Sequence, residues 1–186
     1  MDGEANMQQS NLELFFELVE NQFQYGGQKY AQTETKEATD VLFDDFGKNW
    51  LIGTIAKYCK RYSNLARERD LLKIACYMFI IWLKRGFHIS PDWGTYETIN
   101  TTVETKSKYF DLFKERVKDY YKDSIINITN PLENLYNTLL SWSNKEFNLI
   151  PENDVIDVFG LSYYIWNKET KNKGTDKDTY NEGKEK

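Results

Sequence analysis

The segment from residue 67 to residue 85 constrains the fold most, because it is apolar on nearly every side. Its apolar residues are Leu71, Leu72, Ile74, Ala75, Met78, Phe79, Ile81 and Trp82. A helix with apolar residues all round is buried inside a protein or a membrane. The continuous apolar run, residues 74–83, is too short for a bilayer, which needs about 20 residues. We therefore expect a central buried helix, closed by Gly86.

Further apolar residues recur at helical spacing along most of the chain, which predicts an all-α fold. The helices expected besides the central one cover residues 11–23, 35–46, 50–62, 109–121, 131–147 and 153–167. The glycine pair Gly26-Gly27 is expected to end the first helix and Gly47 the second, since glycine commonly stops a helix.

Composition shifts along the chain predict its domain organisation. An antiparallel bundle of about four helices is expected over residues 11–88, a connection over 89–105 and a C-terminal helical portion over 106–167. Polar residues dominate residues 1–10, which we expect to be a flexible N-terminus, and 168–186, which we expect to be a disordered tail. Short bundles with apolar faces often associate, so a homo-oligomer is expected.

The charge and cysteine content bound the class of protein. The net charge of −5 argues against an extended nucleic-acid-binding surface, but leaves room for a local basic pocket. The chain has only two cysteines, Cys59 and Cys76, in apolar helical surroundings, which is typical of buried, reduced thiols. The polar, acidic start, MDGEANMQQS, is unlike a signal peptide. We expect a cytoplasmic protein that does not enter a membrane.

Several catalytic motifs are absent from the sequence. It contains no GxxxxGK[ST] phosphate loop, no CxxC pair, no HExxH and no Rossmann glycine fingerprint. The one histidine, His88, follows the central helix without an apparent partner, and is expected to be a capping or surface residue.

Three carboxylates form the first candidate site. Glu37, Asp40 and Asp44 are spaced i, i+3, i+7 and so share one face of a helix. Carboxylate oxygens on one face could hold Mg²⁺, with waters and phosphate oxygens completing its octahedron. The alternative is a solvated acidic helix face, which is common on protein surfaces.

Basic and aromatic residues form the second candidate site. Lys57 and Arg61 are helical neighbours at i, i+4, and Lys29, Lys60 and Lys73 lie nearby in the sequence. Such cations can grip a phosphate, while Tyr30, Tyr58 and Tyr77 could stack on a base or hydrogen-bond a phosphate. We expect Tyr58 mainly to pack against the core. The alternative for Arg61 is a salt bridge to Asp70 across the turn between two helices.

These residues follow the order of a known pattern. Lys29-Tyr30, Glu37-Ala38-Thr39-Asp40, Gly53, Lys57-Tyr58-Cys59-Lys60-Arg61 and Asp70-Leu71-Leu72-Lys73-Ile74-Ala75-Cys76-Tyr77 stand in sequence. The segment resembles a small helical family of bacteriophages and mobile elements, one member of which is described as a nucleotide kinase without the usual phosphate loop. Lys29 stands where that family has histidine, and Ile74 where it usually has alanine.

The helix arrangement is also similar, more distantly, to the MazG-like all-α nucleoside triphosphate pyrophosphohydrolases. Those enzymes hold Mg²⁺ with two acidic pairs on adjacent helices. This chain has one such pair, followed by Asp70-x-x-Lys73, which departs from that pattern.

Together the residues and the resemblance imply a nucleotide-handling protein. Expected is Mg²⁺-dependent phosphoryl transfer or hydrolysis on a nucleotide, as in a nucleotide kinase or a pyrophosphohydrolase. Its expected catalytic residues are Glu37, Asp40 and Asp70, its expected nucleotide-binding residues are Lys29, Tyr30, Lys57, Arg61, Lys73 and Tyr77, and its expected Mg²⁺ ligands are Glu37, Asp40 and Asp44. The alternatives are a non-catalytic nucleotide-binding protein, or sponge, and a helical interaction protein.

Overall fold

The structure is all-helical, as the sequence predicts. The structure, a computed structural model, describes residues 2–30, 38–89, 101–121 and 128–173, and within these ranges it contains helices and no strand. The elements are α1 (Asp2–Tyr30), α2 (Ala38–Leu65), α3 (Glu68–Lys84), α4 (Val103–Tyr121), α5 (Pro131–Ser143), a 3₁₀ turn η1 (Phe147–Leu149) and α6 (Glu152–Lys173).

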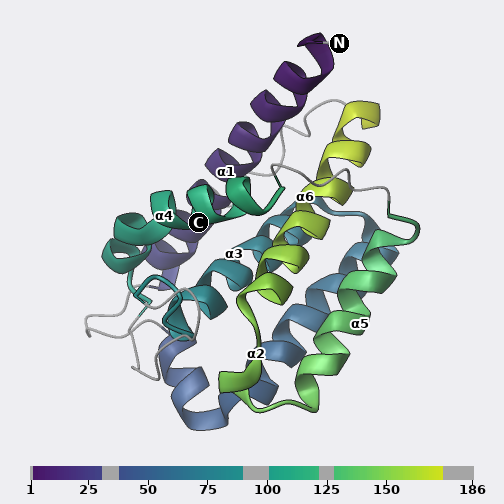
Figure 1. Ribbon diagram of the computed structural model, residues 1–186. Coiled ribbons are helices and arrows are strands. Elements are labelled where there is room, and N and C mark those ends of the chain that lie inside the picture. The colour runs from purple at the N-terminus through teal and green to yellow at the C-terminus, as the bar shows by residue number, and fades with distance from the viewer. Residues whose placement is uncertain (1, 31–37, 90–100, 122–127, 174–186) are drawn as a thin grey trace, which may run out of the picture.

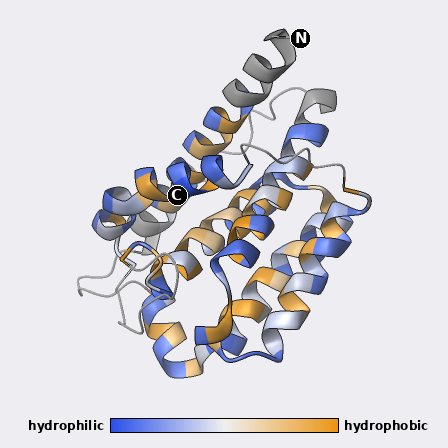
Figure 2. Ribbon diagram, viewed as in Figure 1, coloured by the Kyte–Doolittle hydropathy of each residue, from blue (hydrophilic) through white to orange (hydrophobic). Residues whose placement is uncertain are grey.

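Helix α3 is the central helix, which confirms the expectation from its apolar sequence. It contacts α1, α2, α4 and α6, while α5 packs on α2 and α6 (Figure 1). Apolar residues run along α3 and along the sides of its neighbours that face it (Figure 2). Thirteen residues of α3 are buried, among them the fully buried Trp82 and Phe79. The core of the protein therefore forms around α3.

Of the two helix ends predicted at glycines, the structure contradicts one and contains the other. Helix α1 continues through Gly26 and Gly27 to Tyr30, so the predicted end at the glycine pair is wrong. Glycine inside a helix costs only about 1 kcal/mol relative to alanine, which packing of the rest of the helix can outweigh. Gly47 does interrupt the helical geometry, with φ 68° and ψ −159°, so that α2 consists of two helical segments joined at a kink, and the predicted break is confirmed. Only glycine adopts such a conformation readily.

The boundaries of the later helices also shift. Helix α4 begins at Val103, where the Thr102 hydroxyl accepts a hydrogen bond of 3.2 Å from the backbone N–H of Thr105. This is the usual N-terminal cap of a helix, and it explains a start earlier than residue 109. Helix α5 ends at Ser143, before η1, and α6 extends to Lys173, into the predicted tail.

The C-terminal helices belong to the same core as the N-terminal ones. Phe15 of α1 lies 5.5 Å from Phe159 and 5.2 Å from Trp166 of α6, measured between ring centroids. The indole N–H of Trp82 donates to Glu152, also of α6, over 3.0 Å. The two portions predicted from the sequence therefore pack around one shared core. Among the described helices, none is long and apolar enough to cross a membrane.

Candidate functional site

Three cationic side chains gather around the ring of Tyr58, where α2 and α3 lie side by side. The Nζ atoms of Lys57 and Lys73 lie 4.9 and 5.0 Å from the ring centroid, and the guanidinium carbon of Arg61 lies 5.8 Å from it. Lys57 and Arg61 come from α2 and Lys73 from α3. We call Lys57, Arg61 and Lys73, together with Tyr58, the basic cluster. A ring face attracts cations, which helps to hold these like charges close together.

A second tyrosine extends the aromatic part of the cluster. The ring of Tyr77 stacks on that of Tyr58, with centroids 6.0 Å apart and 27° between the planes. Tyr77 lies one helical turn beyond Lys73 on α3, so the two side chains share a face. Tyr58 is buried, whereas Tyr77 is half-buried and presents part of its ring to solvent. The cluster thus combines positive charge with an accessible aromatic surface.

A buried carboxylate lies beneath the cations. Asp70 is completely buried, and one of its oxygens lies 3.4 Å from Nη2 of Arg61. Neither oxygen accepts a hydrogen bond from any group that the structure describes. Burial raises the pKa of Asp70, while the charges of Arg61, Lys73, Arg67 and Arg69 lower it. Asp70 lies in the first turn of α3, where the helix dipole favours negative charge.

The Arg61–Asp70 ion pair is the one that the sequence offered as an alternative role for Arg61, and the structure contains it. About a third of the Arg61 side chain remains exposed, at 34%. Arg61 can therefore hold the buried carboxylate and still present part of its guanidinium to a ligand.

The cluster carries more positive charge than its surroundings neutralise. The pKa of Lys73 is lowered, first by burial and then by the charges of Arg69, Arg61 and Lys57, with only Asp70 acting in the opposite direction. Within the described ranges, no carboxylate lies within ion-pair distance of Lys57 or Lys73. An anion bound among these side chains would relieve their mutual repulsion.

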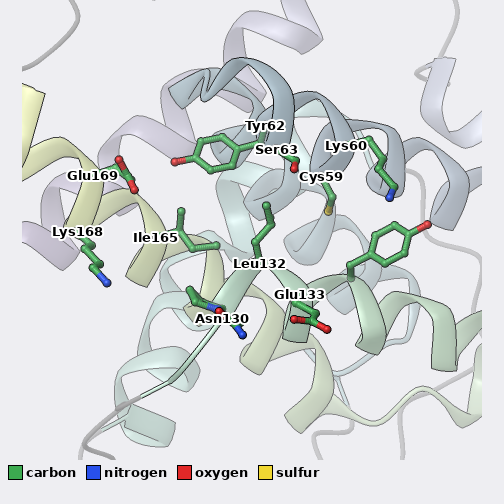
Figure 3. Close-up of a pocket in the computed structure, with 12 residues that line it drawn as sticks. Cys59, Lys60, Tyr62, Ser63, Asn130, Leu132, Glu133, Ile165, Lys168 and Glu169 are labelled. Carbon is green, nitrogen blue, oxygen red and sulfur yellow. The ribbon is translucent and has the colours of Figure 1, made fainter.

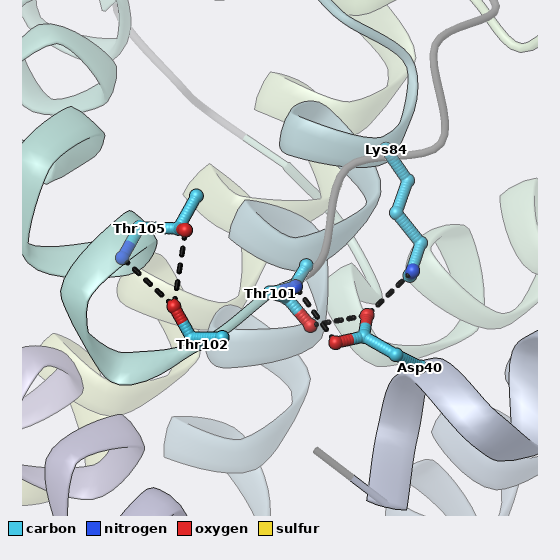
Figure 4. A network of polar contacts seen from close by, with 5 residues as sticks. All are labelled: Asp40, Lys84, Thr101, Thr102 and Thr105. Atoms are coloured by element: carbon cyan, nitrogen blue, oxygen red, sulfur yellow. Dashed lines mark hydrogen bonds and ion pairs between the residues drawn. The ribbon is translucent and has the colours of Figure 1, made fainter. Parts of the chain in front are cut away.

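Asp40 lies in a different place from the basic cluster. It is buried near the start of α2, and its Oδ1 atom pairs with Nζ of Lys84 at 2.7 Å (Figure 4). The hydroxyl of Thr101 donates to Oδ1 and the backbone N–H of Thr101 donates to Oδ2, both over 2.8 Å. Protein groups therefore already occupy the oxygens that a metal ion would use, so the prediction that Asp40 is a metal ligand or catalytic residue finds no support in this geometry.

The single site expected from the sequence is thus divided between the two ends of α3. Asp70 lies in the first turn of α3 and Lys84, the partner of Asp40, in its last turn. At a rise of 1.5 Å per residue these positions are about 20 Å apart. The kink at Gly47 separates the segment of α2 that carries Asp40 from the segment that carries Arg61. Asp40 and the basic cluster therefore do not lie together in one site.

The remaining predicted site residues add little to either place. Asp44 is exposed on α2, whereas Asp40 is buried, so the two do not share an environment. Glu37 lies outside the described residues, as do the side chains of Lys29 and Tyr30 in the last turn of α1. In the part of the chain that the structure describes, no group of three metal-ligating side chains could hold an ion.

Tyr58 is the site residue whose role the sequence analysis missed. We expected it mainly to pack, and it is indeed buried, but it also forms the centre on which three cations converge. The spacing of Tyr58 and Arg61 in the sequence could have indicated this contact. Arg61 stands three residues after Tyr58, and residues three apart on a helix are neighbours.

The two thiols are buried as the sequence indicates, whereas His88 packs between two aromatic rings instead of acting as the expected capping or surface residue. Cys59 and Cys76 are free and buried, and burial raises the pKa of each thiol to about 12. Both are therefore protonated and unreactive at neutral pH. His88 is half-buried between Trp82 and Tyr109, with ring centroids 6.0 and 4.4 Å away.

Comparisons with known proteins found no relative for this chain. No family model, no curated protein and no solved structure matches it. The resemblance to the phage family and to the MazG-like enzymes stays a prediction, and the geometry of the basic cluster carries the functional argument.

Proposed function

We propose that this protein binds a nucleotide at the basic cluster, without using Asp40 in chemistry. The observation that carries the proposal is the convergence of Lys57, Arg61 and Lys73 on one tyrosine ring, with too few neighbouring carboxylates to balance them. Phosphate groups would supply the missing negative charge, and a base would find aromatic surface on Tyr77.

Each side chain of the cluster has a distinct part in this proposal. Lys57 is exposed and Lys73 half-buried, so both can approach a phosphate as point charges from two different helices. Arg61, fixed by its ion pair with Asp70, offers its remaining N–H groups in a fixed orientation. The side chains are held before a ligand arrives, which lowers the entropic cost of binding.

Binding without catalysis is favoured over Mg²⁺-dependent phosphoryl transfer. The catalytic hypothesis needs acidic residues beside the phosphates, yet Asp40 lies at the opposite end of α3 in a fully bonded network. Asp70 is buried beneath the cations and paired with Arg61. A Mg²⁺ ion, in this view, would arrive with the nucleotide and not through a protein site at Asp40.

Calorimetric titration with ATP and with inorganic tripolyphosphate tests the proposal. The variant Lys57→Ala should weaken ATP binding by roughly 1.5–2 kcal/mol, the lower part of the range for hydrogen bonds to charged groups, because Lys57 is exposed. Its melting temperature should be unchanged. ATP should bind more tightly than tripolyphosphate if the base stacks on Tyr77.

The matched control is Lys108→Ala. Lys108 is another exposed lysine that lies over a tyrosine ring, 5.1 Å from the centroid of Tyr109 on α4. Its removal should leave ATP binding as in the wild type. Equal losses of ATP affinity in Lys57→Ala and Lys108→Ala would mean that ATP binding depends only on the net charge of the protein. If neither ATP nor tripolyphosphate binds to the wild type, the proposal is wrong.

A further inference from the structure

A groove of about 600 Å³ opens between α2, α5 and α6, on a different face of α2 from the basic cluster (Figure 3). On a helix with about 100° between residues, the groove residues Cys59 and Ser63 point well away from Lys57 and Arg61. Small-molecule sites in proteins usually enclose about 300–1,000 Å³. The volume therefore suits a small ligand, and the groove is independent of the function proposed above.

The floor and the rim of the groove differ in chemistry. Half of its lining residues are apolar or aromatic, among them Cys59, Leu132, Tyr136 and Ile165. The rim carries two lysines and two glutamates, namely Lys60, Lys168, Glu133 and Glu169. Lys60 lies over the ring of Tyr136, 4.7 Å from its centroid. Because the rim charges cancel, the groove does not favour a polyphosphate, and its floor favours an apolar body.

The hydroxyl of Tyr62 gives the groove a hydrogen-bond donor that bonds to none of the described residues. Tyr62 is 8% exposed, and its ring lies along the groove wall with the hydroxyl turned toward Glu169 and Lys168 (Figure 3). The structure shows no hydrogen bond between this hydroxyl and any residue that it describes. Burial, aided by the charge of Glu169, raises the pKa of Tyr62 to about 12. The hydroxyl thus keeps its proton at neutral pH and can donate a hydrogen bond to a ligand.

The start of α5 supplies further donors at the same groove. Asn130 precedes α5 with φ 57° and ψ 60°, Pro131 occupies the first turn, and no described side chain caps the helix. Asn130, Pro131, Leu132 and Glu133 all line the groove. Uncapped N–H groups in a first helical turn attract anions, because they carry the positive end of the helix dipole.

We propose that this groove binds a small aromatic acid, whose ring lies on the apolar part of the lining and whose polar head accepts a hydrogen bond from the Tyr62 hydroxyl or from the first turn of α5. A helix N-terminus alone would attract many anions. The Tyr62 hydroxyl, which bonds to none of the described residues, and the apolar part of the lining add the selectivity for an aromatic body with a compact polar head.

Fluorescence titration with 3-hydroxy-2-naphthoate, an environment-sensitive two-ring acid, tests the groove. The wild type should bind it saturably and more tightly than about 1 mM. Tyr62→Phe removes only the hydroxyl and should weaken binding roughly three- to tenfold, the worth of one hydrogen bond. Ser63→Trp places a large side chain at the exposed mouth of the groove and should abolish binding.

Two controls make the test decisive. Asn64→Trp introduces the same bulk at the next position of α2, which is exposed but does not line the groove, and it should bind as the wild type does. Lys57→Ala should also bind normally, because the basic cluster lies on another face. Unchanged binding by Ser63→Trp, loss of binding by Lys57→Ala, or no saturable binding by the wild type would each overturn the proposal without bearing on ATP binding.

Discussion

Replacing Lys84 by methionine tests the energetic role of the network around Asp40. The Lys84 side chain is 3% exposed and that of Asp40 is 1% exposed, so both charges lie out of water. Removing one partner of a buried ion pair typically costs about 3–5 kcal/mol, since the other charge is left uncompensated. The two bonds from Thr101 to Asp40 remain in the variant and place the expected loss toward the lower end of that range.

The loss should appear directly in thermal unfolding followed by circular dichroism. For a chain of 186 residues, each kcal/mol shifts the melting temperature by about 2–4 °C, so a loss of about 3 kcal/mol should make Lys84→Met melt about 6–12 °C below the wild type. The matched control is Lys114→Met, because Lys114 pairs with the exposed Asp111 at 2.8 Å. That substitution should cost less than about 1 kcal/mol.

A double-mutant cycle separates the ion pair from general disruption. Asp40→Asn combined with Lys84→Met removes both charges, so its cost should fall below the sum of the single costs by at least about 1 kcal/mol. Equal losses of stability in Lys84→Met and Lys114→Met would show that Asp40 and Lys84 do not form a stabilising buried ion pair. The same would follow if the losses in Asp40→Asn and Lys84→Met simply add in the double variant.

Two further predictions concern Asp70 and Gly160. The pKa of Asp70 is higher in the folded state than in the unfolded state, so the folded state holds the proton more tightly. The free energy of unfolding of the wild type, relative to that of Asp70→Asn, should therefore fall as the pH rises from about 4. The slope should be at most about 1.4 kcal/mol per pH unit. Denaturant titrations across this range measure the difference, and a relative gain of the wild type with rising pH would refute the assignment. Gly160→Ala should destabilise by roughly 1–3 kcal/mol, because its Cβ would lie 1.7 Å from the hydroxyl of Tyr121. Gly53→Ala, where the added methyl group meets no atom within 4 Å in an exposed stretch of helix, should instead stabilise by roughly 0.5–1 kcal/mol.

The sequence predicted the helical class and the central helix because these depend on local periodicity. The spacing of apolar residues in 67–85 was enough to predict that α3 is buried on most sides. The same local logic placed Lys57 beside Arg61, and Lys73 beside Tyr77. It also offered the Arg61–Asp70 pair, because only a short turn separates those two residues.

What the sequence could not predict depends on contacts between distant segments. The partners of Asp40 lie 44 and 61 positions away in the chain, at Lys84 and Thr101, and no local pattern joins them. Gly47 was correctly predicted as a break, but the direction in which the second segment of α2 leaves it depends on tertiary packing. The groove at Tyr62 exists only because α5 and α6 pack beside α2.

The shared core has a consequence for any attempt to divide the chain. A fragment ending near residue 89 would keep α1 to α3 but expose Phe15 and Trp82, which pack on Phe159 of α6 and Phe113 of α4. A fragment beginning near residue 101 would hold α4 to α6 without the helix that they surround. Neither fragment could bury its apolar surface alone, so each is the natural binding partner of the other. Mixing the two should restore helical structure that neither shows by itself, as in split-protein reporters.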